Sequence, residues 1–269
     1  MRRLLTLALM GGLMFWSHVA VVSLFAAISD NLVSCWTMDE ASGTRNDSAA
    51  NANHLTDNNT VASAAGKIGN AADFELSNAE FLSIASNASL VMGNIDFTLV
   101  AWVNPESDAT TKMIVSKNNG GSDGNEYSLY ESIGPGSAGS FGVDYTGSSG
   151  AVGTSTSHSL STWYFLTARH DATADLLKIN ESGGATQSLA TGGLAPATGT
   201  TGLRIGRRDE AGNPFYYDGL IDEVAIWKRA LSDGEITDLY NSGNGRACSY
   251  IVPAAGGSVP RLLLLGVGN

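Results

Sequence analysis

Short stretches in which apolar and polar residues alternate recur from residue 31 to residue 227, and they constrain the fold more than any other feature. Clusters of Gly, Ser, Asn and Asp separate them, as the turns of a β protein require. The predicted strands are 32–38, 72–76, 81–84, 97–103, 113–117, 127–130, 140–145, 163–170, 176–180, 203–206 and 219–227. No helical period intervenes, whereas parallel βαβ units would need one between strands. We therefore predict an all-β, two-sheet antiparallel sandwich.

One short helix is predicted near the end of this region. Ser232 and Glu235 have the spacing of a capping box, in which each side chain satisfies a free N–H group of the first turn. Leu231 and Ile236 occupy the flanking staple positions, and Gly243 is placed to end the helix. We expect this C-terminal helix to be a structural cap on the sandwich.

Residues 1–29 have the pattern of a targeting segment. Two arginines precede an uncharged apolar run, and Ala27 and Ser29 supply the small residues that favour cleavage after Ser29. An uncleaved N-terminal apolar helix is the second interpretation, because a run of this length would span a bilayer. A true start further along the chain is the third. All three leave the same domain, and contact with a membrane is expected only if the segment is retained.

The composition changes again after Cys248. Residues 249–269 contain two prolines and a Gly pair, followed by Arg261 and four leucines. This pattern predicts a flexible linker with an apolar tail that is too short to span a membrane. An added strand, a segment that docks on a partner and a poorly ordered tail all remain open.

The formal net charge of −11 limits the partners of the chain. An anionic surface repels phosphate backbones, and no run of Lys or Arg forms a local basic patch, so we do not expect nucleic-acid binding. The carboxylates could instead hold a hard cation such as Ca²⁺.

Several motifs follow one another in a fixed order along the predicted domain, residues 30–248. They are Trp36–Gly43 with Asp47, Gly66–Ala71 with Phe74, Phe97–Val103, Trp163–Phe165, Gly219–Val224 with Trp227, and Arg229–Tyr240. In this order they resemble the laminin-G-like jelly rolls of the concanavalin A-like lectin/glucanase superfamily. Residues 177–183 depart mildly from the hairpin that family members carry there. The resemblance implies a jelly-roll sandwich and says less about the ligand.

The two cysteines lie near the two ends of the predicted domain. An exported protein with Cys35 and Cys248 can form one disulfide, and the first and last strands of this kind of sandwich commonly lie side by side. We therefore favour a Cys35–Cys248 bridge. The alternative is two unrelated thiols.

Catalysis is not expected from this sequence. Glycosidases of the superfamily carry Glu-x-Asp-x-Glu or Glu-x-Asp-x-x-Glu on one strand, and neither motif occurs here. Asp222 and Glu223 are adjacent, so alternation predicts that they point to opposite faces of their strand. No nucleophile elbow and no zinc-binding pair of histidines is present. A glycoside hydrolase is therefore only a remote alternative.

A structural calcium ion is expected from the resemblance. A carboxylate on an otherwise buried strand costs free energy unless it is paired or bound to metal, and Asp222 is such a residue. The resemblance implies a cation where the first and last strands meet, held by Asp222 and then by Asp39 and Asp47. The alternative is that Asp39 and Asp47 only form turns.

Ligand binding would use aromatic rings on exposed loops beside polar acceptors. The candidate ligand-binding residues are Tyr145, Tyr216, Tyr217, Asp123 and Asn125. The alternative is that these rings belong to the core, where we place Tyr130 and Phe141.

These observations favour a secreted or surface-exposed, non-catalytic module that binds a carbohydrate or another ligand on a cell or virion surface, as an adhesion domain does. The alternative is a structural protein that assembles into a homo-oligomer through its apolar ends.

Overall fold

The protein is described by a computed structural model over residues 27–108, 110–120, 125–134, 137–145, 151–155, 157–208, 212 and 214–252. Residues 133, 134, 137 and 138 are described by their backbone alone. Most of the predicted leader, the tail from residue 253 and Asp123 lie outside these ranges. Within them, no helix combines the length and the apolar character needed to cross a membrane.

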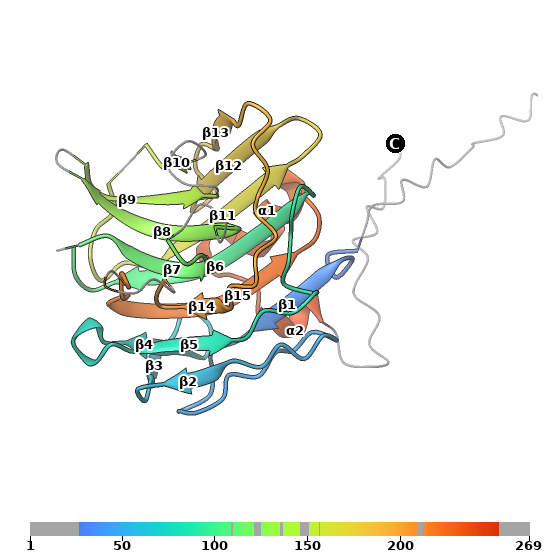
Figure 1. Ribbon diagram of the computed structural model, residues 1–269. Helices are drawn as coiled ribbons and strands as arrows, with labels where there is room; N and C mark the ends of the chain where they lie inside the picture. The colour runs from blue at the N-terminus through green and yellow to red at the C-terminus, as the bar shows by residue number, and fades with distance from the viewer. Residues whose placement is uncertain are drawn as a thin grey trace, which may run out of the picture.

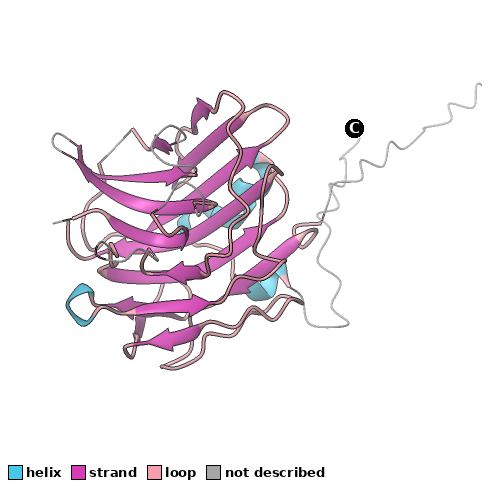
Figure 2. Cartoon of the chain, viewed as in Figure 1, coloured by secondary structure: helices cyan, strands magenta, loops and turns pink. Residues whose placement is uncertain are grey.

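Two antiparallel sheets pack face to face (Figure 1; Figure 2). The eight-stranded sheet has the order β13-β12-β11-β6-β15-β4-β3, and β1 pairs with the end of β15 that β4 leaves free. Its strands are β1 Leu32–Trp36, β3 Ala62–Ala65, β4 Asn70–Phe74, β6 Phe97–Pro105, β11 Tyr164–Asp171, β12 Leu176–Glu181, β13 Gln187–Ala190 and β15 Gly219–Trp227.

The seven-stranded sheet lies in front of it in Figure 1. Its order is β10-β9-β8-β7-β14-β5-β2. The strands are β2 Thr56–Asn58, β5 Phe81–Ile84, β7 Lys112–Lys117, β8 Tyr127–Gly134, β9 Ser137–Asp144, β10 Ala151–Gly153 and β14 Leu203–Ile205. The predicted jelly-roll sandwich is confirmed, and each predicted strand has its counterpart. Four short strands, β2, β3, β10 and β13, were not predicted.

The main core fills the space between the sheets. Phe97, Leu99, Ala101 and Val103 of β6 all point into it, as the alternating pattern predicts. Phe141 is buried there as well, which confirms its assignment to the core. Buried Lys–Glu ion pairs join β7 to its neighbour at both ends of the strand: Lys112 contacts Glu131, and Lys117 contacts Glu126.

A second hydrophobic cluster covers the outer face of the eight-stranded sheet. Helix α1 (Asp233–Tyr240) and the short α2 (Cys248–Ile251) lie over this face. The ring of Tyr240 stacks on Trp102 and on Phe165, with centroids 6.0 Å and 6.1 Å away. Two 3-10 turns complete the described elements, η1 (Leu76–Asn78) and η3 (Asn241–Gly243).

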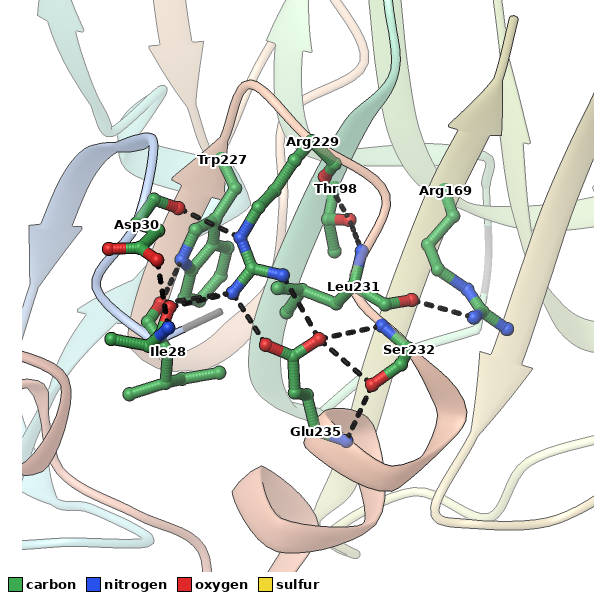
Figure 3. Close-up of polar contacts among 10 residues, drawn as sticks. Ile28, Asp30, Thr98, Arg169, Trp227, Arg229, Leu231, Ser232 and Glu235 are labelled. Atoms are coloured by element: carbon green, nitrogen blue, oxygen red, sulfur yellow. Dashed lines mark hydrogen bonds and ion pairs between the residues drawn. The ribbon is translucent and has the colours of Figure 1, made fainter. Parts of the chain in front are cut away.

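The predicted capping box forms at the start of α1. The Ser232 hydroxyl accepts from the Glu235 N–H, and the Glu235 carboxylate accepts from the Ser232 N–H (Figure 3). The prediction that Gly243 ends the helix was wrong. The helix ends at Tyr240, and Asn241 adopts the left-handed conformation with φ of 49°, which Asn tolerates better than most residues.

The predicted disulfide is also confirmed. Cys35 of β1 and Cys248 of α2 are bridged, with their Cα atoms 5.7 Å apart across 213 residues of sequence. The bridge therefore fixes the end of the domain to its first strand.

The first described residues are held by a polar clamp on the same side of the molecule. The carbonyl of Ile28 accepts from the indole N–H of Trp227 at 2.7 Å, and Arg229 donates to the carbonyls of Ala27 and Asp30 (Figure 3). Glu235 holds the Arg229 guanidinium by two further hydrogen bonds. Residues on both sides of the predicted cleavage point after Ser29 thus contact the domain.

Candidate functional site

The outer face of the seven-stranded sheet carries a row of polar side chains. Strand register places Asp144, Ser128, Ser116, Arg204 and Ser83 next to one another on five adjacent strands. Their sequence neighbours Leu129, Val115 and Leu203 are in the core, so the row points away from it. We call these five residues the polar row.

Tyr130 lies beside the polar row and forms its aromatic border. It is half-buried and packs over Gly142, where a Cβ atom would clash with its ring. Burial, with a smaller contribution from Asp144, raises the pKa of Tyr130 to about 12, so its hydroxyl stays protonated and can donate. The prediction that Tyr130 belongs to the core was wrong, because its neighbours Leu129 and Glu131 take the inward positions.

A second group of rings lies where β5 meets the segment before β15. Phe81 and Tyr216 have ring centroids 6.3 Å apart, and the Arg207 guanidinium lies 4.5 Å from the Phe81 centroid and 5.3 Å from that of Tyr216. All three side chains are half-buried. Sugar rings stack on such amphipathic platforms of aromatic and guanidinium groups.

Two buried oxygen atoms in the row have no hydrogen-bond partner among the described residues. They are Oδ1 of Asp144 and the hydroxyl of Ser116. Burial raises the pKa of Asp144 to about 6, while a hydrogen bond from Ser128 and the charge of Arg208 act in the opposite direction. A buried polar group without a protein partner is usually satisfied by an ordered water molecule or by a ligand.

The predicted ligand-binding residues are only partly brought together. Tyr216 lies at this face, but Tyr145 and Tyr217 are fully buried in the core, so their prediction as exposed rings was wrong. Strand alternation turns Tyr145 inward after Asp144. Tyr217 lies in the loop before β15, where its ring packs edge-on against Phe74 in the core. Asn125 is buried with Oδ1 unpartnered among the described residues, and Asp123 lies outside them.

Tyr130, Phe81 and Asp144 were missed by the sequence analysis. Adjacent residues of a strand point to opposite faces, so the buried Leu129, Leu82 and Val143 would have assigned their neighbours to the outer face.

A separate group of carboxyl groups surrounds the turn between β3 and β4. Oδ2 of Asp222 accepts from the Ile68 N–H at 2.9 Å, and Oδ1 of Asp39 accepts from the Asn70 N–H at 2.7 Å. Gly69 has φ of 64°, and a Cβ atom there would collide with the Asp39 carboxylate. The motifs around Asp39, Gly66–Asn70 and Asp222 thus meet at one place.

Glu223 joins this group because β15 contains a bulge. The register with β6 shifts between Asp222 and Ala225, and Glu223 has φ of 47°. Asp222 pairs with outward-facing Trp102, while Glu223 accepts from the Cys248 N–H at 2.8 Å on the same outer side. The prediction that alternation separates these two side chains was therefore wrong.

Both carboxyl groups are buried and shifted toward the protonated form. Burial raises the pKa of Asp222 to about 7, and the charge of Asp39 adds to this shift. Burial and the neighbouring Asp222 raise the pKa of Glu223 to about 8. Oδ1 of Asp222 and Oε1 of Glu223 have no hydrogen-bond partner among the described residues.

Asp47 does not belong to this group. Its carboxylate accepts from the N–H groups of Cys35, Ala49 and Asn53, so it forms a turn, as the alternative interpretation held. The predicted set of Asp222, Asp39 and Asp47 is therefore wrong in its third member. Within the described ranges, two clusters of three acidic or cysteine residues lie close enough together to share a metal ion. One consists of Asp73, Glu75 and Glu106, and the other consists of Glu223 and the two cysteines, whose sulfurs are already bonded to each other.

Comparison with solved structures finds the same fold in several binding domains. The binding domain of Paraclostridial Mosquitocidal Protein 1 has a TM-score of 0.64 at 15% identity, covering 80% of this chain and 53% of that one. Domain 4 of AbnA, a GH43 extracellular arabinanase from Geobacillus stearothermophilus, in complex with arabinotriose, has a TM-score of 0.56 at 23% identity, covering 77% and 97%. The binding domain of Botulinum Neurotoxin DC in complex with SialylT has a TM-score of 0.55 at 13% identity, covering 80% and 52%. This chain thus spans about half the length of the two toxin domains.

No curated protein sequence matches the chain. At the identities above, the solved structures establish the fold alone. A family model does match the sequence, over residues 77–237, and this range includes the strands that carry the polar row. The protein is accordingly a member of the concanavalin A-like lectin/glucanases superfamily.

Proposed function

We propose that the protein is a non-catalytic extracellular module that binds carbohydrate on the outer face of the seven-stranded sheet. The observation that carries this proposal is the polar row, bordered by Tyr130, Phe81 and Tyr216, in which Asp144 and Ser116 each have an oxygen without a partner among the described residues. Sugar recognition needs this combination, in which rings contact the apolar face of the saccharide and polar atoms complete its hydroxyl hydrogen bonds.

Two of the matched structures support a sugar ligand, since they hold arabinotriose and SialylT. The disulfide supports an extracellular location, because disulfides persist in oxidising compartments and are rare in the cytosol.

The carboxylate geometry supports a binding role over hydrolysis. A glycosidase needs two carboxyl groups facing one groove, about 5 Å apart for retention and roughly 6.5–9.5 Å apart for inversion. The polar row contains one carboxylate, Asp144. Asp222 and Glu223 lie together but are buried under the turn of residues 66–70 and α2.

Removing either ring that borders the polar row is expected to weaken sugar binding. Tyr130→Ala and Tyr216→Ala should each weaken the affinity for the best ligand on a glycan array about tenfold, because one aromatic contact contributes about 1 kcal/mol or more. Tyr250→Ala is the matched control, since Tyr250 is also half-buried and stacked with an arginine but lies beside α1 on the other layer. A silent array, or full binding by both variants, would contradict the proposal.

We also propose that Asp222 and Glu223 hold a calcium ion beside the turn that Asp39 contacts. Support comes from two of their buried oxygens, which have no partner in the part of the chain that the structure describes, because buried carboxyl groups are stable when they coordinate a cation. The role of the ion would be structural, since it would tie β15 to the turn that Asp39 and Asp222 already hold.

Calcium is expected to raise the melting temperature of EDTA-treated protein, and more at pH 8 than at pH 5.5. Protons compete with the cation for the same oxygens at the lower pH. Asp222→Asn should remove the response, whereas Asp233→Asn, at a carboxylate that is 85% exposed, should retain it. Identical melting curves in EDTA and in Ca²⁺ would exclude the ion.

A further inference from the structure

A pocket of about 230 Å³ lies on the opposite layer from the polar row. It is formed between α1 and the turn that joins β12 to β13. Its polar lining comes from Arg169, Asn180, Thr186, Asp233 and Thr237. Pockets for drug-sized ligands measure roughly 300–1,000 Å³, so this one suits a smaller molecule.

Arg169 is the positively charged residue in the lining of this pocket. Its side chain is 8% exposed, and Nη1 donates to the Leu231 carbonyl at 2.9 Å and pairs with Asp233 at 2.8 Å. Within the described part of the chain, Nε and Nη2 meet no acceptor. Figure 3 shows the second terminal nitrogen pointing away from Leu231. One edge of a nearly buried guanidinium therefore remains available.

The partner that neutralises Arg169 is easily displaced. The Asp233 carboxylate is 85% exposed at the first residue of α1, so this ion pair is screened by water. The other walls are already ordered, because both ends of the Asn180 amide hold the turn at Gly183 and Gly184. A ligand would enter a formed pocket and compete with one surface carboxylate.

We propose that this pocket binds a small monocarboxylate of about monosaccharide size, such as a hexuronic acid, through Arg169. The free edge of a guanidinium presents two parallel N–H donors that match a carboxylate. A single negative charge suits the site, because Asp233 lies beside Arg169 and would repel a dianion. The net charge of −11 also disfavours long polyanions. The hydroxyls of Thr186 and Thr237 line the space that the sugar ring would occupy.

Titration of the full chain with sodium glucuronate tests this proposal, with glucose as the neutral control. Glucuronate should bind, and glucose should bind at least tenfold more weakly. Arg169→Gln should reduce glucuronate affinity at least tenfold, and Arg169→Lys should reduce it less, since it keeps the charge and loses the paired donors. Asp233→Asn should increase the affinity at least threefold, because it removes the competing carboxylate.

Asp233→Asn keeps the test decisive if the Arg169 variants do not fold, since Asp233 is exposed. Equal affinity for glucuronate and glucose, or unchanged glucuronate affinity in Asp233→Asn, would overturn the proposal. The two proposals are tested separately, because Tyr130 and Tyr216 variants should not affect glucuronate binding. If glucuronate does not bind, the proposed sugar site on the seven-stranded sheet still stands.

Discussion

Replacing Cys35 and Cys248 together with alanine is expected to lower the free energy of unfolding by about 4 kcal/mol. The bridge closes a loop of 213 residues, so its loss returns a large conformational entropy to the unfolded chain. For a domain of this size the melting temperature should fall by roughly 8–16 °C. Denaturant and thermal unfolding under non-reducing conditions measure both quantities.

The matched control is the unchanged protein with a reducing agent, which breaks the bridge without removing side chains. Both sulfurs are buried, so the reduced protein should move toward the stability of the double variant only after the region around α2 has opened. Limited proteolysis should then cut first near residues 245–252. A double variant as stable as the parent in non-reducing buffer would show that the second cluster holds this segment without the bridge.

The parts of the fold that were predictable are those encoded in neighbouring residues. The capping box needs only Ser232 and Glu235 at the right spacing, and it forms as predicted. The strand Phe97–Val103 shows its inward face in its own alternation. The edge strands β3 and β13 carry no such signal, because each is short and partly exposed, so burial selects no apolar pattern in them.

The candidate sites were less predictable because each depends on a tertiary detail. Alternation assigns Asp222 and Glu223 to opposite faces, and only the bulge with its left-handed Glu223 brings them together. The local sequence does not predict a left-handed conformation at Glu223, because that conformation is uncommon for residues other than Gly, Asn and Asp. Tyr216 and Tyr217 are chemically identical, and the path of the loop before β15 decides which one reaches the surface.

Arg169 illustrates the same limit in another way. The sequence around Arg169 predicts only a strand, and the residue pairs in register with Thr98 and Lys178 in the middle of a sheet. The pocket exists because α1 and the turn after β12, which are far apart in the sequence, approach the same face. The pocket therefore depends on the fold of the chain, and the sequence near each lining residue predicts only a structural role.

The metal-free protein is expected to lose stability as the pH rises from about 4 to 8. The pKa of Asp222 is raised to about 7 and that of Glu223 to about 8, so the folded state binds protons that the unfolded chain releases near pH 4. The stabilisation is complete below the unfolded values and disappears as the pH passes through the folded ones. Since one pKa unit corresponds to about 1.4 kcal/mol, the two groups together change the free energy of unfolding by several kcal/mol.

The double variant Asp222→Asn and Glu223→Gln isolates this contribution, because both amides imitate the protonated acids. In EDTA it should match the parent near pH 4 and exceed it at pH 8, with urea unfolding measured at each pH. Asp144, whose pKa is raised to about 6, also lowers the stability as the pH rises, and it does so in both proteins. The test is therefore the difference in the free energy of unfolding between the parent and the double variant. The control Asp233→Asn should follow the parent, as its carboxylate is exposed. If the double variant declined in parallel with the parent from pH 4 to pH 8, the two buried carboxyl groups would not be the source of the pH dependence.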